Sequence, residues 1–229
     1  MKKIKQLCAC LTMIGFLAIP MTVKAQFDDS RFGIKAGVNL SNFYQEELGE
    51  QNLRAGFHAG IFTELALGES FSLQPELLLT TKGNRISYGE GDNLFNDLVD
   101  EENNALIGDA ETNLTYIELP ILAKFTINEV INLHIGPYFS YLLNASSDVD
   151  GTLGDQLDEL DRDGFNAWDY GLAAGIGVDL NLVTIGFRYD LGLAGVNDDA
   201  TSAANDFTWD ELINDRKNQA LMFYVGVGL

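Results

Sequence analysis

Residues 221–229 read Leu-Met-Phe-Tyr-Val-Gly-Val-Gly-Leu and alternate strictly between two kinds of side chain. A β-strand projects successive side chains to opposite faces, so an extended chain here has one uniformly apolar face and one face of small or mixed residues. The apolar face consists of Leu221, Phe223, Val225, Val227 and Leu229. The same alternation recurs about eight times upstream in segments of roughly ten residues, which is the sequence signature of a transmembrane β-barrel.

Eight strands are predicted, over residues 31–41, 54–67, 71–82, 113–126, 131–144, 167–181, 182–194 and 218–229. Their connections alternate in length. Tight turns are expected at 68–70, 128–130 and 181–182, and long loops at 42–53, 83–112, 145–166 and 195–217. The predicted fold class is therefore all-β: a closed up-and-down antiparallel transmembrane β-barrel of about eight strands, with short periplasmic turns and four long extracellular loops. Closure leaves no sheet edge exposed to lipid.

The distribution of charge supports this interpretation. Of the 34 acidic residues, 24 fall in the four long loops, and the formal net charge is −20. Charged residues within the strands have the parity of the barrel interior. In residues 113–126, for example, Glu118 and Lys124 have interior parity, whereas Ile117 and Phe125 have lipid parity. A charge on the lipid face would cost about 2–4 kcal/mol at the membrane midplane, so this parity is required.

Glycines also cluster at interior positions, where they relieve crowding in a narrow barrel.

The N-terminal segment has the features of a secretory signal peptide. Three lysines in the first five residues precede an apolar core from Leu11 to Ile19, which is too short to span a bilayer. Small residues at Val23 and Ala25 predict cleavage before Gln26. We therefore expect a signal peptide at 1–25 and one barrel domain at 26–229. Both cysteines lie in the signal segment, so no disulfide or thiolate metal site is expected after cleavage.

Two classes of protein are excluded at this stage. No apolar run of 18 or more residues follows residue 26, which rules out a helical membrane protein. Strong acidity argues against nucleic acid as a partner, because phosphate binding needs clusters of lysine and arginine.

Several strand motifs resemble the PorT-like outer-membrane β-barrel family. They are Phe32-Gly33-Ile34-Lys35-Ala36-Gly37-Val38-Asn39-Leu40-Ser41, Gly56-Phe57-His58-Ala59-Gly60, Leu73-Gln74-Pro75-Glu76-Leu77-Leu78, Tyr116-Ile117-Glu118-Leu119-Pro120, Gly136-Pro137-Tyr138, Gly171-Leu172-Ala173-Ala174-Gly175-Ile176-Gly177 and Arg188-Tyr189-Asp190-Leu191-Gly192-Leu193. The resemblance spans essentially every strand. It implies the fold and the outer membrane of a Gram-negative bacterium, and it raises protein secretion as a role by analogy of fold alone.

Charged residues of interior parity predict an ionic cluster in the lumen. Its members are Lys35, Glu76, Glu118, Lys124, Arg188 and Asp190, joined by Glu64, Lys82 and Asp179. A catalytic carboxylate pair or an ion path is one interpretation. The favoured one is a structural, charge-paired plug, because the lumen of an eight-stranded barrel is just wide enough for side chains to fill. We expect Arg188 to bridge either Glu76 or Glu118, since a buried guanidinium needs a carboxylate partner.

Other candidate sites are weaker. His58 and His134 are the only histidines, and both have interior parity, but they lie toward opposite ends of their strands, so no catalytic residue is assigned and an enzyme is not expected. Asp148-Val149-Asp150-Gly151 and Asp161-Arg162-Asp163-Gly164 are similar to calcium loops but lack the full pattern, so no metal or cofactor site is assigned.

The long loops and their rims carry two further features. Short amphipathic stretches in 94–99, 153–160 and 208–211 are candidates for helices over the barrel mouth or for plain loop. Aromatic residues near the outer strand ends are assigned to the membrane-interface girdle: Phe43, Tyr44, Tyr141, Trp168 and Tyr170.

The sequence thus favours a small outer-membrane barrel with a side-chain-filled lumen and a structural or surface-interaction role through its acidic loops. The alternatives are a transport- or secretion-associated component and, less favoured, an outer-membrane hydrolase or acyltransferase. The expected partners are outer-membrane lipid, extracellular or envelope proteins that bind the loops, and divalent cations held loosely by the acidic loops, but not nucleic acid.

Overall fold

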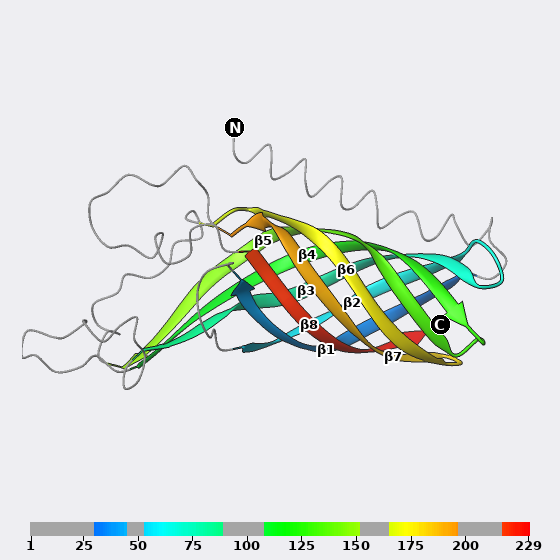
Figure 1. The fold of residues 1–229 in the computed structure, drawn as a ribbon, viewed down its shortest axis with the longest axis horizontal. Coiled ribbons are helices and arrows are strands. Elements are labelled where there is room, and N and C mark those ends of the chain that lie inside the picture. The colour runs from blue at the N-terminus through cyan, green and yellow to red at the C-terminus, as the bar shows by residue number, and fades with distance from the viewer. Residues whose placement is uncertain (1–29, 45–52, 89–107, 152–164, 197–216) are drawn as a thin grey trace, which may run out of the picture.

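The chain forms one closed barrel of eight antiparallel strands (Figure 1). In the computed structural model, the described residues are 30–44, 53–88, 108–151, 165–196 and 217–229. The strands are β1 (Arg31–Tyr44), β2 (Arg54–Ala66), β3 (Phe71–Tyr88), β4 (Gly108–Ile127), β5 (Ile131–Gly151), β6 (Trp168–Leu180), β7 (Val183–Gly195) and β8 (Lys217–Gly228). Each strand pairs with the next, and β8 pairs with β1 from Gly33↔Gly228 to Tyr44↔Lys217. No described residue belongs to a helix long and apolar enough to cross a membrane.

The number and order of the predicted strands are confirmed, but four strands are longer than predicted: β1 continues to Tyr44, and β3, β4 and β5 extend further still. The β3–β4 pairing continues to Tyr88↔Gly108 and the β4–β5 pairing to Gly108↔Gly151. These outer stretches were assigned to loops because they are polar and lack apolar alternation. A strand that has left the lipid needs no apolar face, so the pattern that locates strands inside a membrane does not detect their continuation outside it.

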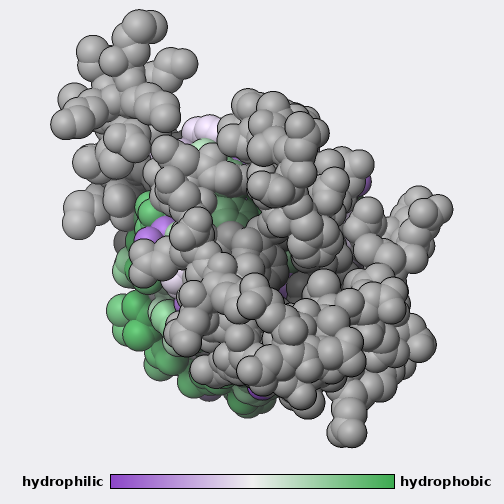
Figure 2. Space-filling model, turned by 90° about the vertical axis from the view of Figure 1, so that its left-hand side faces the viewer, coloured by the Kyte–Doolittle hydropathy of each residue, from purple (hydrophilic) through white to green (hydrophobic). Residues whose placement is uncertain are grey.

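The two faces of the barrel wall differ as the parity predicted. Residues of the outer face are exposed, for example Ile34 at 55%, Phe187 at 52% and Leu221 at 46%, whereas their interior neighbours Met222 and Tyr224 are 1% and 3% exposed. Figure 2 looks onto the end with the long connections, and the wall that is visible there is predominantly hydrophobic.

Interior glycines form sockets for large side chains of neighbouring strands. A Cβ on Gly186 would lie 2.5 Å from the Tyr224 hydroxyl and 2.7 Å from the Ile176 carbonyl oxygen. A Cβ on Gly171 would lie 2.8 Å from the ring of Tyr138. The glycines therefore make room for the aromatic and charged side chains that fill the lumen.

Short turns join the strands at one end of the barrel. Asn128 and Glu129, between β4 and β5, have φ values of 51° and 60°, and Asn181, between β6 and β7, has a φ of 56°. Asparagine tolerates this left-handed conformation better than most residues, which suits it to tight hairpin turns.

The socket arrangement predicts that Gly186→Ala destabilises the barrel, because the added methyl group meets the Ile176 carbonyl as well as the tyrosine hydroxyl. The loss is expected to be about 1–3 kcal/mol, as for other overpacked interiors. Urea unfolding followed by heat-modifiable gel migration measures it. Gly195→Ala is the control, because nothing lies within 4 Å of its added Cβ. Equal stability of the two variants would contradict the socket interpretation.

Candidate functional site

Three groups of ion pairs fill the lumen along the barrel axis, and a further pair, Arg54–Glu111, lies at the loop end. The turn-side cluster contains Arg31, Glu64, Lys124 and Asp179, the central cluster contains Lys35, Glu76 and Arg188, and the loop-side cluster contains Lys82, Glu118 and Asp190. All six residues assigned to the lumen from sequence are buried there, as are Glu64 and Lys82.

Glu76 is the centre of the network. Its Oε2 accepts from Arg188 Nη1 at 2.9 Å and its Oε1 from Arg188 Nη2 at 2.8 Å, in bidentate geometry. The Lys35 ammonium also pairs with Glu76, and it lies 4.2 Å from the centre of the Tyr224 ring. Of the two partners expected for Arg188, the structure therefore has Glu76. One carboxylate joins β1, β3 and β7, none of which is a neighbour of another in the barrel.

The turn-side cluster joins four strands. The Lys124 ammonium lies 3.1 Å from both Glu64 Oε2 and Asp179 Oδ2. Arg31 donates to Glu64 at 2.7 Å, and Thr184 donates to Asp179 at 2.6 Å. Each carboxylate thus has several donors, which a carboxylate in a low-dielectric interior requires.

The loop-side cluster contains more carboxylates than cations. Lys82 Nζ lies 2.6 Å from Glu118 and 3.6 Å from Asp190. Asp169, which sequence reasoning did not single out, is also buried and accepts a hydrogen bond from Asn218 at 3.2 Å. Its parity with interior Gly171 on β6 is the signal that would have found it.

The histidines do not form a catalytic site with the residues that the structure describes. His58 Nδ1 lies 2.6 Å from Asn39 Oδ1. The Asn39 amide nitrogen donates to the Thr80 hydroxyl and the Phe57 carbonyl, so its oxygen accepts and His58 donates. His134 Nδ1 contacts Asn132 Oδ1 at 3.1 Å. Neither contact pairs a histidine with a hydroxyl nucleophile, which acyl-transfer catalysis requires.

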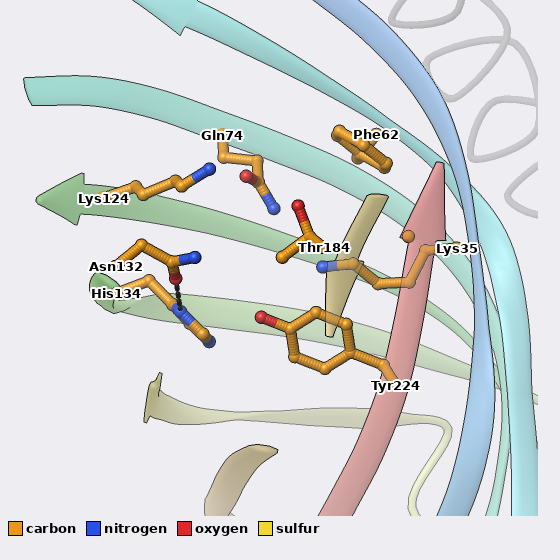
Figure 3. A pocket seen from close by; sticks show the side chains of 9 residues that line it. Lys35, Phe62, Gln74, Lys124, Asn132, His134, Thr184 and Tyr224 are labelled. Carbon is orange, nitrogen blue, oxygen red and sulfur yellow. Dashed lines mark hydrogen bonds between the residues drawn. The ribbon is translucent and has the colours of Figure 1, made fainter. Parts of the chain in front are cut away.

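A small cavity lies beside the turn-side and central clusters (Figure 3). The side chains of Lys35, Lys124, His134, Thr184 and Tyr224 contribute to its lining. It offers about 10 Å³ to the centre of a water molecule, which is room for about one water. An organic substrate does not fit in this space.

No group of three or more potential metal ligands gathers among the described residues. Of the two stretches similar to calcium loops, residues 148–151 belong to β5, where Asp148 pairs with Glu111 and Asp150 with Asp109. The other, Asp161-Arg162-Asp163-Gly164, lies outside the described residues, as do the candidate helices in 94–99, 153–160 and 208–211.

Comparison with known proteins identifies the family. Residues 24–197 match the family described as outer membrane protein beta-barrel domain. The chain belongs to this family. Strands β1 to β7 lie within the matched residues, and β8 completes the barrel beyond them. The protein is accordingly a small β-barrel of the Gram-negative outer membrane. Barrels of this kind have short turns on the periplasmic side and longer connections outside the cell, and by this rule the end of the barrel with the tight turns faces the periplasm.

Solved structures of outer-membrane barrels are similar to this chain. Ail of Yersinia pestis, in complex with the heparin analogue sucrose octasulfate, is 13% identical with a TM-score of 0.45, and the alignment covers 87% of this chain and 99% of Ail. Neisserial surface protein A is 13% identical with a TM-score of 0.45, and the alignment covers 86% of this chain and 96% of the other. A comparison with curated proteins gives no match.

The exposure of the aromatic side chains corrects one of the assignments to the membrane-interface girdle. Trp168 and Tyr170 are 51% and 50% exposed on the outer face, and Tyr141 packs edge-on against Trp168. Phe43, by contrast, is 1% exposed and lies in the lumen. Its assignment to the girdle was wrong because it has the same odd parity as Lys35 and Ser41 and therefore points inward.

The central cluster predicts that Glu76→Gln destabilises the barrel more than Arg188→Met does. Loss of the carboxylate charge leaves two buried cations without a counter-ion, whereas loss of Arg188 leaves the Lys35–Glu76 pair. We expect a cost of about 3–5 kcal/mol for Glu76→Gln, the range for a broken buried pair. Urea unfolding in lipid vesicles measures both variants, with Glu69→Gln in an exposed turn as the control. A larger loss for Arg188→Met would contradict this account.

Proposed function

We propose that the protein is a membrane-anchored surface-interaction protein. In this proposal the barrel fixes the protein in the outer membrane, and the extracellular loops and outer strand ends bind proteins outside the cell or in the envelope. The carrying observation is that β3, β4 and β5 continue outward beyond the strands beside them. β5 runs nine residues past Leu142, which is the last residue that bonds to the part of the segment before β6 that the structure describes, residues 165–167. At about 3.3 Å per residue this is roughly 30 Å.

The filled lumen supports this proposal over a transport role, which would need an open pore. Arginine, lysine and tyrosine side chains occupy the interior, and the ion pairs Arg188–Glu76 and Lys82–Asp190 connect the opposite strands β3 and β7. Moving a solute through the barrel would require breaking several buried ion pairs at once, each at a cost of several kcal/mol. We therefore expect the partners of the protein to bind at the ends of the barrel and not within its lumen.

The chemistry of the exposed end suggests the kind of partner. By sequence, the β3–β4–β5 extension carries Asp109, Glu111, Asp148 and Asp150, and the extracellular connections are strongly acidic. Proteins with basic surfaces are favoured by this charge, and divalent cations would bind loosely to the loops. The same charge disfavours nucleic acid. We propose no enzymatic activity, because within the described strands and turns the side chains bonded to His58 and His134 are asparagines and not nucleophiles.

Photo-cross-linking in living cells tests this function. A photoreactive residue at position 146, on the extension, is expected to give discrete adducts with other proteins, whereas one at position 185, on the lipid face, is expected to give none. Purified protein in planar bilayers is expected to show no solute-sized conductance. Absence of adducts from position 146, or steady conductance of the native protein, would refute the proposal.

A secretion-associated role is the second candidate, supported by the resemblance of the strand motifs to the PorT-like family. Its partners would be envelope proteins that reach the periplasmic face. A photoreactive residue at position 129, in the β4–β5 turn, distinguishes the two roles. Adducts from position 129 together with none from position 146 would favour secretion over surface interaction.

We also propose that residues 1–25 are a signal peptide removed during export, so that the barrel domain begins at residue 26. The basic start, the short apolar core and the small residues before Gln26 support this boundary. N-terminal sequencing of protein purified from outer membranes is expected to give Gln26 as the first residue. Recovery of Met1 would contradict it.

A further inference from the structure

An apolar cluster occupies the lumen at its extracellular end. It consists of Phe43, Leu114, Tyr116, Leu142, Phe165 and Val196, all at most 5% exposed. Four of these residues belong to the barrel strands β1, β4 and β5, whereas Phe165 and Val196 come from the connecting segments beside β6 and β7. Side chains from the wall and from the connections therefore meet in one layer.

On the three strands that contribute to it, β1, β4 and β5, this layer marks a change from apolar to polar interior residues. On β5, Leu142 belongs to the cluster, and the next interior residue toward the periplasm is Ser140, which donates to Glu118 at 3.1 Å. On β4, Tyr116 belongs to the cluster and Glu118 is the next interior residue. On β1, Phe43 is followed inward by buried Ser41. The apolar layer thus lies directly over the loop-side cluster.

Backbone contacts fix Phe165 in place. Asn166 N donates to the Val196 carbonyl at 2.7 Å, and Leu142 N donates to the Ala167 carbonyl at 2.9 Å. The Asn166 side chain donates to the Gly195 carbonyl at 3.3 Å and accepts from Trp168 N at 3.1 Å. The segment before β6 is thereby bound to both β5 and the end of β7, and Phe165 continues the inward parity of Asp169.

The charged residues of the loop-side cluster lie directly beneath the apolar layer and would be exposed to the outside medium without it. Glu118, Asp169 and Asp190 are buried there, and Lys82 is the ammonium in contact with two of them. Both carboxylate oxygens of Asp190 make no hydrogen bond with any described residue. An open mouth would allow cations and water to reach these carboxylates, whereas ions cross an apolar constriction only by losing their hydration.

We infer that Phe165 is the centre of an apolar stopper that closes the extracellular mouth of the lumen. The packing of these side chains therefore separates the polar interior from the outside medium. Residues at the other end, such as Thr184, are only partly buried and border the cavity of Figure 3, so the lumen exchanges water on the periplasmic side. This inference rests on the closed lumen of the proposed function but is independent of the binding role.

Thiol labelling tests the stopper. Cys8 and Cys10 are replaced by serine, and Ser140→Cys provides one probe beneath the layer. A membrane-impermeant cationic methanethiosulfonate reagent is added outside intact cells. We expect Ser140→Cys to be protected from the reagent while Phe165 is intact. When Phe165→Ala or Phe165→Asp is added, the rate of labelling at position 140 should rise at least tenfold. The aspartate variant prevents neighbouring apolar side chains from refilling the gap. Phe187→Ala, on the lipid face, is the matched control and should leave the probe protected.

The outcomes separate this inference from the proposed function. Labelling of Ser140→Cys with Phe165 intact would overturn the stopper, and so would protection in both Phe165 variants when gel migration shows that they are folded. A Thr184→Cys probe should react in every background with reagent admitted to the periplasm, and its protection would overturn the periplasmic access. None of these results changes the cross-linking at position 146, which tests the binding role alone.

Discussion

The paired contact between Arg188 and Glu76 is the interaction on which the interior depends. Membrane strands must satisfy their backbone groups within the sheet, so the sheet closes, and eight strands enclose a lumen no wider than side chains can fill. The charged groups placed there are stable only if each one finds a partner. Glu76 on β3 provides this for two cations, Lys35 from β1 and Arg188 from β7 on the far side of the lumen, and the clusters on either side also pair charges from different strands. The barrel is consequently tied together across its lumen as well as around its circumference.

Different strands contribute different kinds of side chain to the lumen. Strands β3 and β4 supply Glu76, Lys82, Glu118 and Lys124, all long charged side chains. Strands β6 and β7 supply glycines at several facing positions, so large groups such as Tyr138 and Tyr224 extend over bare backbone. The aromatic rings in turn lie beside the cations, with Lys35 4.2 Å from the Tyr224 ring centre and Lys82 4.3 Å from that of Tyr138. Glycine content and charge pairing are thus two parts of one packing solution.

Parity along the strands made the barrel and the identity of its interior residues predictable from sequence. The same rule places Phe43 and Asp169 inside. Phe43 was assigned to the membrane interface because it lies near a strand end, and Asp169 was not singled out although it lies within the predicted strand 167–181. The sequence did not decide whether Arg188 pairs with Glu76 or with Glu118, since parity fixes the face of the strand on which a residue lies but not its position along the barrel axis. That position depends on the stagger of the strands, which the hydrogen-bond register sets. The outer ends of β3, β4 and β5 were missed because no lipid imposes a pattern there.

The two ends of the lumen are closed by different kinds of side chain, because the connections between strands are short at one end and long at the other. At the periplasmic end, the turns are short, so only strand residues can close the lumen, and they do so with ion pairs such as Lys124–Glu64. At the extracellular end, the longer connections can return a residue to the interior, and Phe165 does so between β5 and β7. An apolar cluster excludes water without needing a partner of opposite charge, whereas an ion pair retains its affinity for water. Long connections therefore allow a dry closure that tight turns cannot provide, and this places the drier end of the lumen toward the outside of the cell.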